Sequence, residues 1–185
     1  MEKKNNYISF NNKINYWIIL LLLFSLHISS CKSSKKNKKQ KQRKEARVKQ
    51  KPVSAGSGEV ETVLQTAKSY IGTRYKFGGS SRSGMDCSGL VCVSFQSASV
   101  KLPRTSEEQS KTGTKVDLDE VIPGDLVFFT DRKGHKKVTH VGIVTNVRGK
   151  QDVRFIHSST KLGVVEDNLY AEYYIKLFLK AVRIF

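Results

Sequence analysis

The chain has 185 residues, of which 33 are Lys or Arg and 16 are Asp or Glu, giving a formal net charge of +17 at pH 7. This length allows a leader and one compact domain, and it excludes two domains of ordinary size. The charge is uneven, since residues 32–51 alone contribute +10 of it. The overall charge is therefore weak evidence for a nucleic-acid-binding protein.

Residues 1–30 have the pattern of a processing signal. Three lysines precede an apolar run over residues 17–26, which is too short for a comfortable membrane span. The run ends in Ile28-Ser29-Ser30-Cys31, which resembles the lipobox of bacterial lipoproteins. That resemblance implies that Cys31 is lipidated and becomes the mature N-terminus. A plain transmembrane anchor, or an ordinary secretory signal with a chance cysteine, is the alternative.

Residues 31–56 are predicted to be a lipidated cysteine followed by a basic, disordered tether. Between Lys32 and Lys51 there are eleven Lys or Arg residues and one acid, Glu45, with almost nothing apolar. Such a segment cannot bury enough surface to offset the entropy of ordering. Anionic lipid head groups or acidic wall polymers are the expected partners, because an exported chain rarely meets nucleic acid. A solvated spacer without a specific partner is the alternative.

The remaining domain, residues 57–185, is predicted to begin with three helices. Apolar residues recur at helical spacing in the first, with Gly72 at its end: Val60, Val63, Leu64, Ala67, Tyr70 and Ile71. A Gly- and Ser-rich loop, residues 73–83, separates it from a second helix that has Cys87 in its first turn. Thr105 and Glu108 form a capping box for a short third helix after Pro103.

The second half of the domain is predicted to be β-structure. Four segments are rich in β-branched or aromatic residues: 126–130, 138–144, 153–156 and 181–185. Helices followed by strands indicate an α+β domain with the helices packed on one face of an antiparallel sheet. In this arrangement the second helix begins beside strands that carry His140 and His157.

The chain has three cysteines, and we expect no disulfide. Cys31 is assigned to lipid, which leaves Cys87 and Cys92. If both lie on one helix, about 7.5 Å of helical rise separates them, which exceeds the usual Cα spacing of a disulfide. We therefore expect two reduced thiols, with Cys92 as a small core residue.

Cys87 and the two histidines are a candidate nucleophile, base and orienting group. Cysteine becomes a good nucleophile when an adjacent base or a helix N-terminus favours its thiolate. A helix start also offers backbone N–H groups to an oxyanion. Histidines on neighbouring strands can lie within hydrogen-bonding distance, so His140 could contact Cys87 while His157 holds its far nitrogen.

Five motifs occur in the order found in one known family. They are Tyr75-Lys76-Phe77-Gly78-Gly79, Gly84-Met85-Asp86-Cys87-Ser88-Gly89-Leu90-Val91, Leu102-Pro103-Arg104, Pro123-Gly124-Asp125-Leu126-Val127-Phe128-Phe129 and His140-Val141-Gly142-Ile143-Val144. Together they resemble the NlpC/P60 cysteine peptidases across nearly all of residues 59–185. The short lipoprotein form is similar to the Spr-type murein endopeptidases of Gram-negative envelopes.

The resemblance implies a papain-like α+β fold and hydrolysis of amide bonds in peptidoglycan stem peptides. It assigns Cys87 as nucleophile, His140 as base and His157 as the third polar residue. Tyr75 matches a tyrosine near the oxyanion and the substrate, whereas Asp86 and Ser88 match residues that help to hold the stem peptide. The scissile bond stays open between γ-D-glutamyl-diaminopimelate and D-alanyl-diaminopimelate.

The resemblance also carries expectations about the whole protein. It implies a monomer without a cofactor or metal, lipid-anchored in the cell envelope. We expect the outer membrane, facing the periplasm, because Lys32 after Cys31 is not the acidic inner-membrane retention signal known for some bacteria.

Two other functions are alternatives to a cysteine peptidase. Zinc can be held by three His and Cys ligands, so Cys87, His140 and His157 could form a metal hydrolase, although no HExxH or comparable spacing is present. A lipid-anchored scaffold that binds the wall without catalysis would not need the three residues together.

Overall fold

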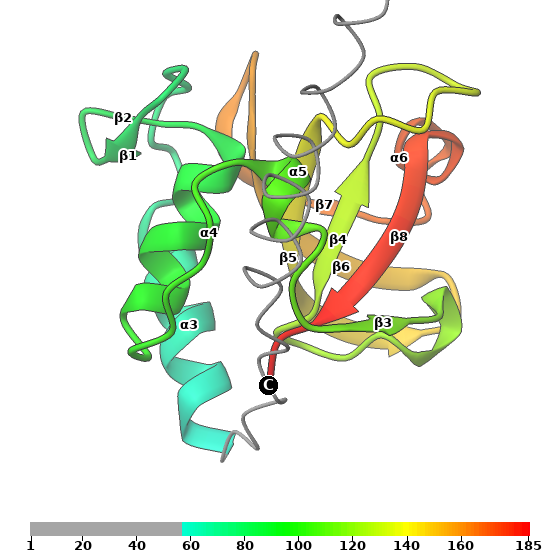
Figure 1. Cartoon of the computed structure of the whole chain (residues 1–185), viewed down its shortest axis with the longest axis horizontal. Helices are drawn as coiled ribbons and strands as arrows, with labels where there is room; N and C mark the ends of the chain where they lie inside the picture. Colours follow the sequence, from blue (N-terminus) through cyan, green and yellow to red (C-terminus); the bar gives the residue numbers. More distant parts are fainter. Residues whose placement is uncertain (1–56) are drawn as a thin grey trace, which may run out of the picture. The chain divides into compact units, whose positions relative to one another are not determined.

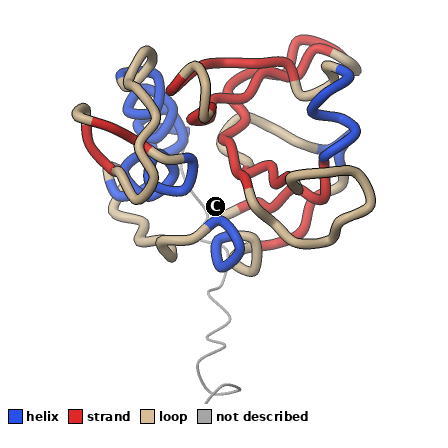
Figure 2. The backbone as a smooth tube through the Cα atoms, turned by 90° about the horizontal axis from the view of Figure 1, so that it is seen from above, coloured by secondary structure: helices blue, strands red, loops and turns tan. Residues whose placement is uncertain are grey.

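The computed structural model describes residues 57–185. The predicted leader, the lipidated Cys31 and the basic tether lie outside these residues. Helices α3 and α4 pack beside a curved six-stranded sheet, and both views separate this helical part from the strands (Figures 1 and 2). None of the helices in residues 57–185 combines the length and apolarity needed to cross a bilayer.

The helices pack through apolar faces, as their spacing predicts. Their bounds are Ser57–Ser69 for α3, Cys87–Gln96 for α4, Ser106–Gln109 for α5 and Glu172–Leu177 for α6, with a 3₁₀ turn at Leu118–Glu120. Val63 and Ala67 of α3 are fully buried together with Leu90 and Phe95 of α4. The N-cap half of the capping box is confirmed, since the Thr105 hydroxyl accepts the Glu108 backbone N–H at 3.3 Å. The Glu108 carboxylate accepts a hydrogen bond from the Thr105 hydroxyl at 2.8 Å.

The sheet is antiparallel throughout, in the strand order β3-β8-β4-β5-β6-β7. Its strands are Thr114–Val116 for β3, Leu126–Phe129 for β4, His140–Gly149 for β5, Asp152–Ser159 for β6, Gly163–Asn168 for β7 and Phe178–Arg183 for β8. A separate pair, Ser80–Ser81 (β1) and Gly84–Met85 (β2), lies in the loop before α4. The predicted α+β class is confirmed.

Both faces of the sheet are buried. Leu126 and Phe128 of β4 belong to the apolar core shared with α3 and α4. Their neighbours Val127 and Phe129 belong to a second core, which lies on the opposite face because successive strand residues alternate. Partly buried aromatic and aliphatic residues around α6 pack against this second core: Tyr170, Tyr174, Leu177 and Phe178. The sequence predicted the helical face and missed the second one.

Candidate active site

Cys87 is the first residue of α4, and Asp86 is its N-cap. The Asp86 carboxylate accepts the Gly89 backbone N–H at 2.6 Å, so one oxygen satisfies a donor in the first turn. The fully buried Leu90 and Val91 anchor the same turn in the core. The thiol is therefore held at a rigid helix start.

A bidentate ion pair fixes the Asp86 cap. Arg104 donates from Nη1 to Oδ1 at 2.9 Å and from Nη2 to Oδ2 at 2.7 Å, and the Gly78 N–H donates to Oδ2 at 2.8 Å. Burial alone would raise the pKa of Asp86, but Arg104 and the backbone donors outweigh it and lower that pKa. The ionised carboxylate thus joins the loop before α4, the helix start and the segment after the helix.

Gly89 allows this loop to lie directly against α4. A Cβ at this position would be 2.2 Å from the Gly79 carbonyl oxygen and 2.9 Å from Asp86 Oδ1. We expect Gly89→Ala to lower the free energy of unfolding by about 1–3 kcal/mol, measured by thermal melting. Gly58→Ala is the control, because a Cβ there has nothing within 4 Å. Equal melting temperatures for Gly89→Ala and the parent would contradict this close approach.

The two histidines come from adjacent strands. His140 begins β5 and His157 lies on β6, whose register pairs Ile143 with Ile156. His157 therefore lies diagonally across from His140 on the same face. His140 Nε2 and His157 Nδ1 are 2.9 Å apart, and the two rings meet nearly edge to face, at 86°. The structure brings the predicted base and orienting residue into direct contact.

The hydrogen-bonded chain continues beyond His157. The His157 Nε2 atom lies 2.9 Å from Oδ2 of Asp167 on β7, and the Tyr174 hydroxyl on α6 donates to the same oxygen at 2.6 Å. Burial would raise the pKa of Asp167, but Tyr174 and His157 outweigh it and lower that pKa. Asp167 is therefore a carboxylate that can only accept hydrogen bonds.

This carboxylate determines where the protons lie on both rings. Because Asp167 only accepts, His157 must carry its proton on Nε2. Neutral His157 then has an unprotonated Nδ1, which accepts the proton that His140 carries on Nε2. Nδ1 of His140 keeps its lone pair. The hydrogen bonds thus assign Nδ1 as the basic atom of His140.

The same argument requires a neutral His157, and the surroundings of both imidazoles favour the neutral form. Burial first, and the neighbouring His157 second, lower the pKa of His140 to about 3. Burial also lowers the pKa of His157, although Asp167 partly opposes it. A neutral His140 near pH 7 is able to accept a proton.

Cys87 lies next to the start of β5. The sulfur interacts with the backbone N–H groups of Val141, Ser88 and Cys87, and these hydrogen bonds act to lower the thiol pKa. Val141 follows His140 in the chain. Burial is the largest effect and raises that pKa overall. The helix N-terminus was expected to favour the thiolate. Burial opposes this effect and raises the thiol pKa, which favours the thiol.

The other predicted site residues surround Cys87. Burial raises the pKa of Tyr75, and the nearby Cys87 and Asp86 raise it further. The Tyr75 side chain is partly exposed beside the nucleophile. Ser88 is buried, accepts a hydrogen bond from Arg104 Nη1 at 2.9 Å and lies 3.3 Å from Asp86 Oδ1. In the structure, Asp86 and Ser88 therefore bind Arg104.

The sequence interpretation missed three residues of this site. Arg104 was part of a quoted motif but received no role, whereas Asp167 and Tyr174 were not considered. The segment Gly163–Asn168 contains two consecutive valines before its acidic residues, a weak strand signal that could have placed Asp167 beside β6. Within residues 57–185, no group of three His, Cys, Asp or Glu side chains is arranged to hold a metal ion.

A helix-start cysteine beside histidines on an antiparallel sheet defines an α+β protein with a papain-like site. Comparisons with known sequences agree. Residues 72–183 match the NlpC/P60 family. The chain is 42% identical over 118 residues to the probable endopeptidase NlpC of Escherichia coli (strain K12), covering 63% of this chain and 73% of that protein. This chain belongs to the NlpC/P60 family.

Longer relatives contain a similar domain. The chain is 42% identical over 123 residues to the bifunctional muramidase/DL-endopeptidase CwlT of Bacillus subtilis (strain 168), covering 64% of this chain and 37% of CwlT. A solved NlpC/P60 family protein from Bacillus cereus has a TM-score of 0.62 and 31% identity, over 68% of this chain and 40% of that one. This chain thus spans well under half of either protein.

Proposed function

We propose that this protein is a cysteine peptidase that hydrolyses amide bonds in peptidoglycan stem peptides. The observation that carries the proposal is the arrangement of Cys87, at the start of α4, beside the hydrogen-bonded chain His140–His157–Asp167. The names of the two similar proteins, an endopeptidase and a muramidase/DL-endopeptidase, support the reaction class and the cell-wall substrate.

The geometry supports a mechanism that begins from neutral partners. The Cys87 sulfur attacks the scissile carbonyl carbon as its proton passes to His140 Nδ1, and the carbonyl oxygen becomes an oxyanion. The Cys87 backbone N–H and the Tyr75 hydroxyl are the proposed oxyanion donors. When the C–N bond breaks, His140 returns the proton to the leaving amine. His140 then deprotonates a water, which hydrolyses the thioester and regenerates the thiol.

The zinc alternative is less compatible with the histidines. Zinc ligands direct a lone pair at the ion, whereas His140 Nε2 and His157 Nδ1 face each other at 2.9 Å and His157 Nε2 faces Asp167. Three of the four ring nitrogens are thus engaged within the hydrogen-bonded chain. Nδ1 of His140 takes no part in that chain, and we propose it as the atom that accepts the Cys87 proton.

Digestion of purified sacculi tests the reaction and identifies the bond. Mass spectrometry of the released products distinguishes cleavage after γ-D-glutamate from cleavage of the D-alanyl cross-link. We expect iodoacetamide to abolish product release and EDTA to leave it unchanged. Inhibition by EDTA but not by iodoacetamide would reject the cysteine mechanism and favour zinc.

Location is a separate part of the proposal. We propose that Cys31 is acylated after the leader is removed, and that the protein is anchored in the outer membrane facing the periplasm. We expect Cys31→Ala to release the protein from the membrane fraction or to leave the precursor uncleaved. Detergent partitioning and intact mass measure this. A variant with the parent's partitioning and mass shift would contradict lipidation at this cysteine.

A further inference from the structure

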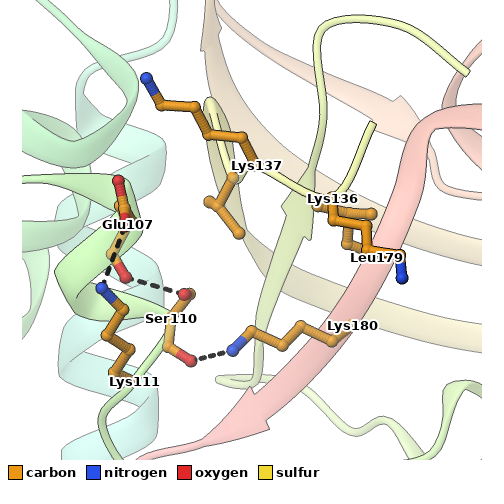
Figure 3. Close-up of a pocket in the computed structure, with 8 residues that line it drawn as sticks. Glu107, Ser110, Lys111, Lys136, Lys137, Leu179 and Lys180 are labelled. Carbon is orange, nitrogen blue, oxygen red and sulfur yellow. Dashed lines mark hydrogen bonds and ion pairs between the residues drawn. The ribbon is translucent and has the colours of Figure 1, made fainter. Parts of the chain in front are cut away.

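A cavity of about 390 Å³ lies between the helical part of the domain and the sheet. Eight residues line it: Glu107, Ser110, Lys111, Lys136, Lys137, Val138, Leu179 and Lys180. They come from α5 and the residues after it, from the β4–β5 connection and from β8. Figure 3 shows Lys180 reaching from β8 to Ser110, whereas Lys111, just after α5, points to Glu107.

The charge of this lysine cavity is strongly unbalanced. Four of the eight lining residues are lysines and one is acidic. That acid, Glu107, already pairs with Lys111 at 3.0 Å. Hydrogen bonding to Lys111 is the main cause of its lowered pKa, and Lys137 contributes further. The lining thus carries three more ammonium groups than carboxylates.

The pKa of Lys180 is affected by the same crowding of positive charge. Its ammonium group donates to the Ser110 carbonyl oxygen. Burial lowers the pKa of Lys180, and repulsion from Lys111 and Lys115 lowers it further. An anion in this cavity would relieve that repulsion, and it would interact with several ammonium groups at once.

The lysine cavity adjoins the candidate active site. Val138, at its edge, precedes the base His140 by two residues, which corresponds to about 7 Å of extended chain. On the helical side, Gln109 immediately precedes the lining residue Ser110, and its side-chain amide donates to the Ser88 carbonyl oxygen at 3.1 Å. The cavity and Cys87 thus share two neighbouring segments, α5 and the chain that enters β5.

Stem peptides carry the complementary charge. A D-glutamate linked through its γ-carboxyl keeps a free α-carboxylate, and diaminopimelate, which has two carboxyl groups, keeps at least one more. We propose that the lysine cavity binds the free carboxylates of the stem peptide and thereby positions the stem for attack by Cys87. This inference rests on the proposed function, and it adds a charge requirement for the substrate.

Binding to an inactive enzyme tests the inference separately from catalysis. The probe is the tripeptide L-Ala-γ-D-Glu-diaminopimelate, with a fully amidated copy as its neutral counterpart. Titration calorimetry uses full-length Cys87→Ala protein at low ionic strength, where exposed ion pairs are least screened. The cavity variant adds Lys111→Gln, Lys136→Gln and Lys137→Gln. The control variant adds Lys68→Gln, Lys101→Gln and Lys150→Gln, which remove the same charge at exposed sites outside the cavity lining.

We expect the cavity variant to bind the free-carboxylate tripeptide about tenfold more weakly than its parent. The loss of three exposed ion pairs weakens binding by about this factor. Binding of the amidated tripeptide should be equal in both, and the control variant should match the parent. Equal loss in the cavity and control variants would overturn the inference and indicate a general charge effect. If the cavity lysines instead govern binding to phosphatidylglycerol vesicles and not to the tripeptide, the surface is a membrane contact and the inference is wrong.

The two proposals fail in different ways. If the enzyme with Cys87 intact digests sacculi but the cavity lysines do not affect tripeptide binding, only the inference is wrong. If it does not digest sacculi, the proposed function is wrong whatever the calorimetry gives.

Discussion

Cys87→Ala should lower the rate of peptidoglycan hydrolysis by about 10⁴-fold or more while leaving the melting temperature close to that of the parent. Alanine keeps the helix start, because the N-cap hydrogen bond runs from the Gly89 backbone to Asp86, and only the nucleophile is lost. Release of soluble fragments from purified sacculi measures the rate. Cys92→Ala is the matched control, since that thiol donates to the Pro103 carbonyl oxygen and has no part in the proposed mechanism.

The base should behave as part of the same unit. We expect His140→Ala to be nearly as inactive as Cys87→Ala, and the double variant to be little worse than either one, because nucleophile and base act together. Additive losses in the double variant would mean that His140 acts independently of the thiol. Substantial hydrolysis by Cys87→Ala alone would reject the nucleophile assignment.

Local sequence patterns predicted the parts of the fold that depend on neighbours in the chain. The α4 start at Cys87 and the N-cap bond between Thr105 and Glu108 are one-turn features, and the structure has both. The strands that carry His140 and His157 are long, and the first of them is rich in β-branched residues. A hairpin then brings the two histidines together, so their contact was predictable from sequence.

Two of the three missed residues lie on elements that were also missed. Asp167 is on β7, a six-residue strand that ends in acidic and amide residues, and Tyr174 is on α6, a helix of six residues. Such short segments give no clear periodicity. Tyr174 is held by packing against Phe129 and Phe155, with ring centroids 5.7 and 4.9 Å away, which are contacts between distant parts of the chain.

The protonation of Cys87 also depended on tertiary structure. A helix start indicates a lowered thiol pKa, and the backbone N–H groups do act in that direction. How deeply the thiol is buried depends on the approach of β5, which the sequence does not specify. Burial is the larger effect and raises the pKa, so tertiary structure opposes the effect that the helix start predicts.

Asp167→Asn should lower kcat by roughly 10- to 100-fold with little change in KM, because Asp167 acts on the tautomers of the two histidines and lies outside the substrate contacts proposed here. The asparagine has the same shape, but its amide group can donate to His157 Nε2. His157 would then carry its proton on Nδ1 and donate to His140 Nε2. His140 would hold its own proton on Nδ1, the atom that must accept the Cys87 proton.

The tautomers can be observed directly. Nitrogen-15 chemical shifts of the histidine side chains should show protonated Nε2 atoms on both residues in the parent and protonated Nδ1 atoms in Asp167→Asn. Tyr174→Phe is the comparison variant: it removes the 2.6 Å hydrogen bond to Asp167 but keeps the carboxylate, so it should preserve the parent tautomers and cost less activity. A loss of kcat in Asp167→Asn with unchanged histidine tautomers would assign Asp167 a purely structural role. Unchanged kcat would remove it from the mechanism.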